Sequence, residues 1–195
     1  MPDIKHFDPD AALEAVVRLF WERGVAATGI QEVVDRTGIS RSSLYATFGG
    51  KQDLYLAALR RYVEQWSRPA FAQLAADPRG LPAVTGFFAE LIRLRCRGPY
   101  ARWGCMIANA HTGPSSTEPA VRQLLDAHHE SLVGAMRSVL RTAAARGQLV
   151  PGAEPDAAAE LLALLAYGVN LRSRTGADPA TLEATVTAAL TPYAK

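Results

Sequence analysis

Hydroxyl and basic side chains are concentrated between residues 28 and 51, in the stretch TGIQEVVDRTGISRSSLYATFGGK. Between Arg36 and Lys51 there are three basic residues and no acidic one, although residues 1–61 contain eight of each sign. Phosphate backbones bind cations and hydroxyl donors, and arginine can bind guanine through two hydrogen bonds. The segment therefore suits contact with double-stranded DNA. The candidate contact residues are Thr28, Gln31, Ser40, Arg41, Ser42, Ser43, Tyr45, Thr47 and Lys51.

Two short helices joined by a tight turn are expected to position this set. Thr28 is predicted to cap the first helix, with Gln31 completing a capping box, and Gly38 to end it in a left-handed turn. Ser40 is predicted to cap the second helix, which ends at residues 49–50. This arrangement is that of a helix-turn-helix, whose second helix enters the major groove of DNA.

Side chains on the second helix have different expected tasks. Residues 41–43 occupy its first turn, where they reach base edges. The hydroxyls of Thr28 and Ser40, at helix starts, and the ammonium of Lys51 are expected to contact phosphates. Thr28 alternatively serves only as a cap.

The same helix also carries residues that are expected to hold it in place. Leu44 and Phe48 have the four-residue spacing of a buried face, so we interpret them as structural. Tyr45 and Thr47 flank the DNA-facing side and are expected to touch a phosphate or a thymine methyl group. For Tyr45 a packing role is the alternative.

The whole chain of 195 residues is predicted to be all-α. Apolar residues make up 49% of it and 35 residues are alanine, which excludes a disordered chain. Periodicity and caps predict about nine helices, with a break or kink in the fourth at Pro69, near Trp66. The expected helical ranges are 8–24, 28–38, 40–50, 51 to near 66, 81–97, 103–111, 118–146, 155–174 and 179–191. The chain is expected to divide into residues 1–50, a compact three-helix unit that binds DNA, and residues 51–195, a larger helical body.

Residues 8–58 resemble the TetR family of bacterial transcription regulators. The resemblance rests on the opening AALxxVVxLFxxxGVxATGIQEVVDRTGIS, on Ser40 to Tyr45, on the Y-x-x-F pattern ending at Phe48, and on a lysine followed by residues 53–55, Asp-Leu-Tyr. It implies a homodimeric repressor that binds a palindromic operator and is released by a small-molecule effector. Gly49 and Gly50 depart from the polar residue that is usual before the lysine, which puts a phosphate contact there in doubt.

Large apolar side chains in the middle of the chain are candidates to line an effector pocket, since such pockets are mostly apolar with a few polar groups. Polar residues on otherwise apolar helices need partners, which makes them candidates too. Arg95 belongs to a basic run that suits an anionic effector, or else a solvated face. The candidate ligand-binding residues are Trp66, Phe71, Phe87, Phe88, Leu91, Arg95, Trp103, Cys105, Met106, Asn109, Met136, Tyr167 and Asn170. For the apolar ones an ordinary core role is the alternative.

Cys105 lies in a G-C-x-x-x-N segment that resembles one branch of the TetR family, some members of which sense electrophiles or oxidants through the cysteine. A thiolate near a helix N-terminus and near Arg102 is stabilised and therefore more reactive. Buried cysteine more commonly fills apolar space. A switchable disulfide with Cys96 is a further alternative.

Neither catalysis nor metal binding is indicated. His128 and His129 point about 100° apart on a helix and do not suit one metal ion, and no catalytic carboxylate pair or phosphate loop is found. We expect no cofactor and no enzyme. Two alternatives remain open: a helical ligand-binding module without DNA function, and a thiol-dependent enzyme.

The last two predicted helices, 155–174 and 179–191, carry more leucine than one buried face needs. Four leucines at positions 161, 162, 164 and 165 wrap around the first of them, which predicts burial on two sides. We expect a homodimer through these helices, with a monomeric core as the alternative. No apolar run is long enough for a membrane span and no secretory signal is found, so a cytoplasmic protein, located at the nucleoid when bound to DNA, is expected.

Overall fold

The computed structural model describes residues 7–195, so the start of the predicted DNA-binding range, with His6, lies outside it. The described part is all-α, with one isolated bridge between Leu149 and Ala194 in place of any strand. The helices are α1 Pro9–Arg23, α2 Ile30–Thr37, α3 Arg41–Phe48, α4 Lys51–Tyr62, α5 Arg68–Ala76, α6 Leu81–Cys96, α7 Met106–His111, α8 Pro119–Ala145, α9 Pro155–Arg174 and α10 Pro179–Leu190. A π-helical turn, Val63–Ser67, joins α4 to α5, and 3-10 turns cover Pro114–Thr117 and Thr191–Tyr193.

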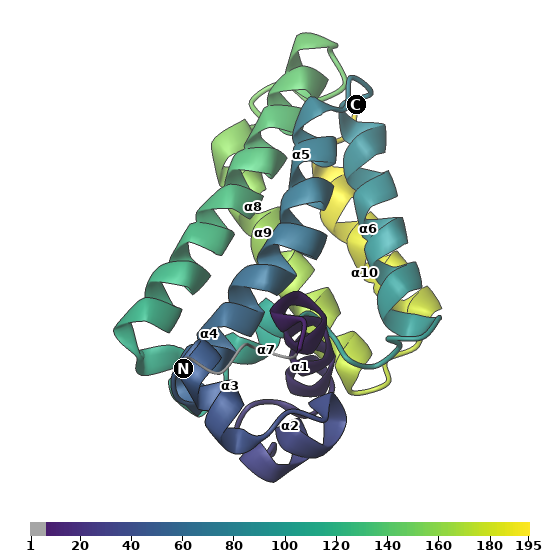
Figure 1. The fold of residues 1–195 in the computed structure, drawn as a ribbon. Coiled ribbons are helices and arrows are strands. Elements are labelled where there is room, and N and C mark those ends of the chain that lie inside the picture. The colour runs from purple at the N-terminus through teal and green to yellow at the C-terminus, as the bar shows by residue number, and fades with distance from the viewer. Residues whose placement is uncertain (1–6) are drawn as a thin grey trace.

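The first three helices form a unit at one end of the molecule (Figure 1). Asp8 caps α1 by accepting a hydrogen bond from the Asp10 amide, and Pro9 occupies the first helical turn, as predicted. α1 packs against both α2 and α4. Its buried face includes Val16, Phe20 and Trp21, so α1 is the element on which the helix-turn-helix rests.

Pro69 does not break the chain's fourth helical segment. The Arg68 amide donates to the carbonyl of Val63, five residues earlier, and the π turn passes directly into α5 with Pro69 in its first turn. Proline lacks an N–H and its ring clashes with the carbonyl four residues before it in a regular α-helix. The wider turn provides the space, so α4 and α5 form one continuous rod, and the described residues contain the nine rods that the sequence predicts.

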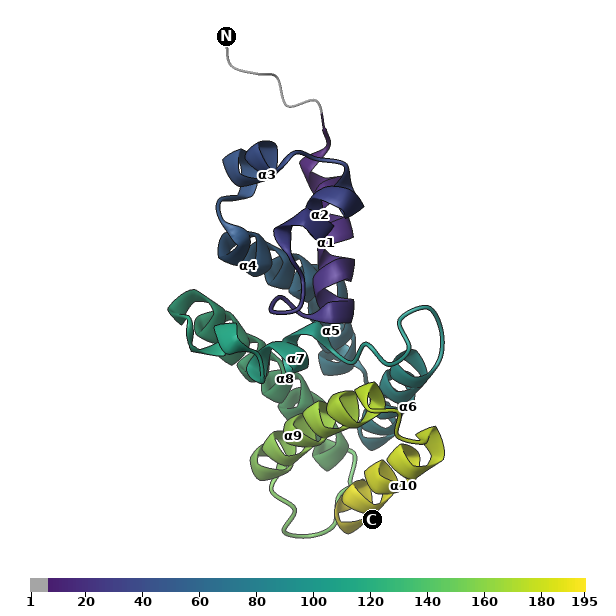
Figure 2. The same ribbon diagram turned by 90° about the horizontal axis from the view of Figure 1, so that it is seen from below.

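α8, with 27 residues, is the longest helix of the remaining body, and it packs against α5, α6 and α9. α6 lies between α9 and α10 on one side and α5 on the other. Figure 2 shows α9 and α10 at the side of the body away from α3. Two cores result: one joins α1–α4 to α7 and the start of α8, and the other fills the body.

Within the described residues, no helix is both long and apolar enough to cross a membrane.

Candidate DNA-binding surface and effector cavity

The turn between α2 and α3 has the geometry that the sequence predicts. Gly38 adopts φ +71° and ψ 11°, in the left-handed region that favours glycine, and its amide donates to the Val34 carbonyl. Ser40 caps α3 by accepting from the Ser43 amide at 3.2 Å. The turn and cap fix α3 at an angle to α2, as a helix-turn-helix requires.

α3 presents polar side chains to solvent and apolar ones to the core. Arg41 and Ser42 are exposed, and the Arg41 guanidinium carbon lies 5.3 Å from the centre of the Tyr45 ring. Leu44 is completely buried and Phe48 is half-buried against the same core, which agrees with their predicted structural role. The solvent-facing surface of α3 therefore begins with the Arg41 guanidinium, which forms no ion pair within residues 7–195.

Thr28 is not the cap of α2. Its side chain is completely buried and its hydroxyl donates to the Gly24 carbonyl at 2.8 Å, so it ties the α1–α2 loop together. Gly29 is the N-cap, and Glu32 rather than Gln31 accepts its amide at 2.9 Å. Gln31 is exposed and donates to Asp35. The predicted capping box is thus displaced by one residue along the chain.

Three further members of the predicted contact set differ in accessibility. Thr47 is half-buried, and its hydroxyl oxygen is buried without a hydrogen-bond partner in the described structure. Ser43 and Lys51 are half-buried, Lys51 being the first residue of α4, whose N-cap is Gly50. The hydroxyls of Ser40 and Ser43 lie 2.9 Å apart.

An aromatic cluster links α1 to the body. The Trp21 indole N–H donates to the Gly104 carbonyl at 2.9 Å, and its ring lies within 5.4 Å, centre to centre, of those of Tyr62, Trp66 and Trp103. Trp21 is 1% exposed. Because aromatic pairs of this geometry stabilise beyond simple burial, the orientation of α1 depends on the residues around this ring.

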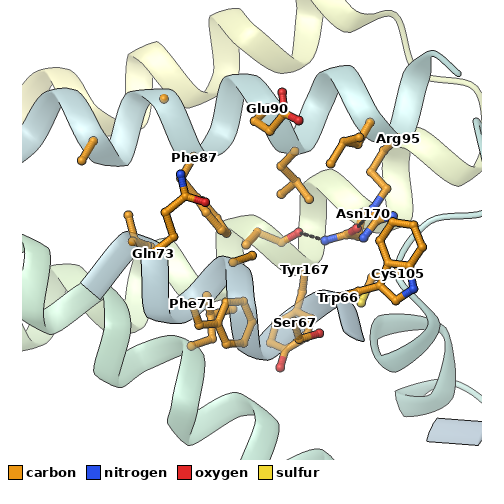
Figure 3. A pocket seen from close by; sticks show the side chains of 18 of the residues that line it. Trp66, Ser67, Phe71, Gln73, Phe87, Glu90, Arg95, Cys105, Tyr167 and Asn170 are labelled. Atoms are coloured by element: carbon orange, nitrogen blue, oxygen red, sulfur yellow. Dashed lines mark hydrogen bonds between the residues drawn. The ribbon is translucent and has the colours of Figure 1, made fainter. Parts of the chain in front are cut away.

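A cavity of about 260 Å³ lies between α5 and α6, with α4, α8 and α9 around its inner end. This volume is near the lower end of small-molecule sites, which run to about 300–1,000 Å³. Figure 3 shows Trp66, Arg95, Cys105 and Asn170 gathered at one end of the cavity, and Gln73 and Phe87 at the other. The cavity therefore has an inner end beside the aromatic cluster and an outer, apolar part.

Arg95 is the charged group at the inner end, although it is only 8% exposed. Its Nε donates to Asn170 Oδ1 at 2.9 Å and its Nη2 to the Tyr62 hydroxyl at 3.0 Å. The guanidinium carbon lies 5.3 Å from the centre of the Trp21 ring, in a cation–π contact. A single side chain thus touches both the cavity and the tryptophan of α1.

A second buried polar group, His128, also lines the cavity. Its Nε2 lies 3.0 Å from the Ser67 hydroxyl and its Nδ1 lies 3.4 Å from the Tyr167 hydroxyl. Burial, with nearby His111 and His129, lowers the pKa of His128 to about 4, so the ring is neutral at pH 7. Burial also raises the pKa of the Tyr167 phenol, which stays protonated.

Some predicted ligand-binding residues line the cavity and others do not. The lining members are Trp66, Phe71, Phe87, Leu91, Arg95, Cys105, Tyr167 and Asn170. Phe88 and Met136 are completely buried in the body core instead. Met106 and Trp103 belong to the other core, and Asn109 donates to the Trp103 carbonyl at 2.8 Å, which holds the loop before α7.

Sequence reasoning missed several lining residues, chiefly Tyr62, Ser67, Gln73, Glu90 and His128. The buried Ser67 and His128 carried a usable signal, since each interrupts an apolar helical face. His128 is therefore a polar lining residue of the cavity.

The two cysteines are both free thiols, and only Cys105 lines the cavity. It is the N-cap residue of α7 and is 6% exposed. Cys96 is half-buried on α6, and burial raises its pKa.

An apolar stripe on α9 is left uncovered in the single chain. Leu161, Leu164 and Leu171 are 46%, 56% and 38% exposed, and Gly168 lies between the last two at helical spacing. On α10 the small residues Ala184 and Ala188 are also exposed. Exposed leucines in such a row mark a surface for association.

Comparisons with known proteins agree with this geometry. Residues 12–58 match the family model described as "Bacterial regulatory proteins, tetR family", and residues 80–189 match "Tetracyclin repressor-like, C-terminal domain". The chain is 28% identical over 174 residues to the HTH-type transcriptional repressor ComR of Escherichia coli K12, covering 89% of this chain and 83% of ComR.

Solved structures extend the similarity to the whole fold. A cysteine mutant of the TetR family transcriptional regulator CifR, in complex with 26-base-pair operator DNA, has a TM-score of 0.84 and 27% identity, covering 98% of this chain and 99% of that one. The reduced form of NemR from E. coli has a TM-score of 0.79 at 18% identity, covering 95% and 97%, and shows likeness of fold alone.

Proposed function

The chain belongs to the TetR family of bacterial regulatory proteins, and on this premise we propose that it is a repressor that binds a palindromic operator as a homodimer and is released by a small molecule. It is a helix-turn-helix transcriptional regulator, as its family and its curated relatives are. Residues 1–50 carry the DNA contacts and residues 51–195 the ligand and dimer contacts in this proposal.

The exposed, basic first turn of α3 is the observation that carries the DNA-binding part. Arg41 and Ser42 extend from it into solvent, while Leu44 fixes the helix from behind. A helix held in this way places its first turn in the major groove. CifR, which shares the fold throughout, is bound to its operator in the solved complexes. Thr28 is left out of the proposed contacts because its side chain is buried and its hydroxyl donates to the Gly24 carbonyl.

The apolar stripe on α9 supports the homodimer. Leu161, Leu164 and Leu171 would be buried against the same residues of a second copy, since a two-fold interface is self-complementary. Exposed Ala184 and Ala188 on α10 allow close approach at its edge. In the dimer the two α3 helices would lie about 34–36 Å apart, so that they enter successive major grooves of the DNA.

The contact of Arg95 with Trp21 supports a route for release. A ligand in the cavity that moves Arg95 alters the packing of Trp21, and Trp21 lies on the helix against which the helix-turn-helix packs. The ligand then favours a state with altered α3 spacing, and its preference for that state weakens DNA binding by the same free energy.

Gel-shift titration against the DNA flanking the gene tests the DNA-binding part. Arg41→Ala should weaken operator binding about 5- to 150-fold and relax base preference, because a bidentate arginine contact discriminates by about 1–3 kcal/mol. Arg146→Ala removes an equal charge at the far end of α8 and should leave binding unchanged. An Arg41→Ala variant that binds like the parent contradicts the assigned contact, and absence of salt-dependent binding by the parent favours a ligand-binding module without DNA function.

A second candidate function, thiol-based sensing, is favoured by the position of Cys105. Its thiol lines the cavity at the same end as Arg95 (Figure 3). N-ethylmaleimide is the probe, since it adds to a thiol. Cys105→Ser should abolish release of operator DNA by the reagent, and Cys96→Ser, outside the cavity, should not. Release that persists in Cys105→Ser, or no release in the parent, refutes this function.

A further inference from the structure

The inner end of the cavity holds a buried positive charge with no negative partner. Arg95 forms no ion pair within residues 7–195, and its hydrogen-bond partners, the Asn170 amide and the Tyr62 hydroxyl, are neutral. Burying an unpaired guanidinium is costly, because water is replaced by a medium of low polarity. An arrangement of this kind is compensated when a ligand supplies the missing anion.

Donor capacity at Arg95 is also unused. A guanidinium has five N–H donors, of which two are engaged, by Asn170 and Tyr62, so three of the five remain without an acceptor in the described structure. The Nη1 group is among the unengaged donors, and Arg95 is one of the residues that line the cavity. Paired N–H donors of arginine match the two oxygens of a carboxylate.

Carboxylates at the outer part of the cavity do not neutralise this charge, because each has its own partner. Glu90 binds the Arg93 guanidinium through both oxygens, at 2.6 and 2.7 Å. Asp77 binds Arg79 in the same way, at 2.6 to 3.2 Å. The cavity thus has a mouth of balanced charge and an inner end that is positive.

The lining between these two ends is apolar. Phe71 of α5 and Phe87 of α6 face the cavity (Figure 3), and Leu91 of α6 is a further lining residue. The neutral Ser67–His128–Tyr167 chain provides further hydrogen-bonding groups without a charge. The volume of about 260 Å³ suits a compact molecule rather than a long chain or a large ring system.

We infer that the effector is a small carboxylate with a compact apolar body, whose carboxylate pairs with Arg95 and whose body lies between α5 and α6. This inference rests on the proposed regulatory function and names the chemical class of its ligand. Binding of the carboxylate draws the guanidinium away from the face of the Trp21 ring. Because Trp21 is part of α1, this change alters the packing of α1.

Three probes of nearly equal shape test the inference by isothermal titration calorimetry on the full chain. Benzoate, benzamide and benzamidine differ mainly in charge, which is negative, neutral and positive. Benzoate should bind about tenfold or more tightly than benzamide, because hydrogen bonds to a charged acceptor are about twice as strong, and benzamidine should bind least well. Equal or tighter binding of benzamide or benzamidine overturns the inference, as does the absence of benzoate binding at millimolar concentration.

Substitutions then locate the charge that is responsible. Arg95→Met keeps an apolar stem and should remove the preference for benzoate over benzamide, whereas Arg97→Met, at an exposed position after α6, should retain it. Arg95→Lys keeps a charge and should retain part of the preference, which covers the case in which the methionine variant does not fold. A preference that survives in a folded Arg95→Met variant refutes the assignment.

The gel shift without ligand is a separate measurement. A parent protein that fails to bind its flanking DNA contradicts the proposed regulator and leaves the benzoate preference to be judged by calorimetry alone. A parent that binds DNA but prefers benzamide contradicts only the ligand class.

Discussion

His128 should make the stability of this protein depend on pH between 4 and 6.5. The ring is 5% exposed, its two nitrogens face the hydroxyls of Ser67 and Tyr167, and the Phe71 ring lies 5.1 Å away, centre to centre. Its pKa is about 4 in the folded chain and 6.5 when free, so the unfolded chain binds the proton more readily. The neutral ring is accommodated above pH 6.5, and stability is lost as the pH falls toward 4.

The size of the loss follows from the two pKa values. Acidification from pH 7.5 to pH 5 should lower the free energy of unfolding by about 2 kcal/mol through this group, and the full difference below pH 4 is about 3 kcal/mol. Urea denaturation followed by circular dichroism, at one fixed protein concentration, measures both values.

Two variants separate His128 from the other groups nearby. His128→Gln keeps a hydrogen-bonding side chain without a proton to gain, so it should lose about 2 kcal/mol less than the parent between pH 7.5 and pH 5. His129→Gln, at the neighbouring half-buried position that pairs with Glu160, should retain most of the loss. The reasoning is refuted if His128→Gln and the parent lose the same stability over this range. Burial also lowers the pKa of His111, which contributes in the same direction in all three proteins.

The α9 stripe and the Trp21 hydrogen bond give two further predictions. Leu164→Glu places a charge in the proposed dimer interface, so the variant should be a monomer by analytical ultracentrifugation and should bind the operator much more weakly. Leu94→Glu changes an exposed leucine of α6 that lies outside the α9 stripe, and this variant should remain a dimer. Trp21→Phe leaves the Gly104 carbonyl without its donor and should lower the free energy of unfolding by about 1–3 kcal/mol in urea titrations. A dimeric Leu164→Glu, or a Trp21→Phe variant as stable as the parent, contradicts the corresponding contact.

Local signals explain why the helix-turn-helix could be predicted from the sequence. Gly38 and Ser40 determine the turn and the cap through their own backbone and side-chain chemistry, and the structure places both as expected. The predicted N-cap of α2 lies one residue too early, because the Gly29 amide donates to Glu32 and the Thr28 hydroxyl donates to the Gly24 carbonyl. These hydrogen bonds depend on how the loop packs, which spacing alone does not determine.

The cavity was only partly predictable, for a related reason. Helical periodicity shows that Phe88 and Met136 are buried, but it does not show whether a buried side chain faces another helix or an empty space. Arg95 and Asn170 were informative because polar groups on apolar helices need hydrogen-bond partners. In the structure Arg95 Nε donates to Asn170 Oδ1. Asn109 satisfied the same rule through a backbone carbonyl outside the cavity.

The π turn between α4 and α5 changes the spacing of buried residues along one continuous rod. The fully or nearly buried positions on the relevant face are Leu54, Ala58, Tyr62, Ser67, Phe71 and Leu74. Their steps are four, four, five, four and three residues, and the step of five falls within the turn. The turn therefore contains one residue more than a regular α-helix would need to join these two buried faces.

Removal of one exposed residue there, such as Gln65, would make the step four and keep both faces in rotational phase. The rod would then become a regular α-helix at this point, and the Pro69 ring would meet the carbonyl four residues before it. The extra residue in the π turn therefore allows Pro69 to lie within a continuous helical rod. The α4 part of the rod still packs against α1, and the α5 part still lines the cavity.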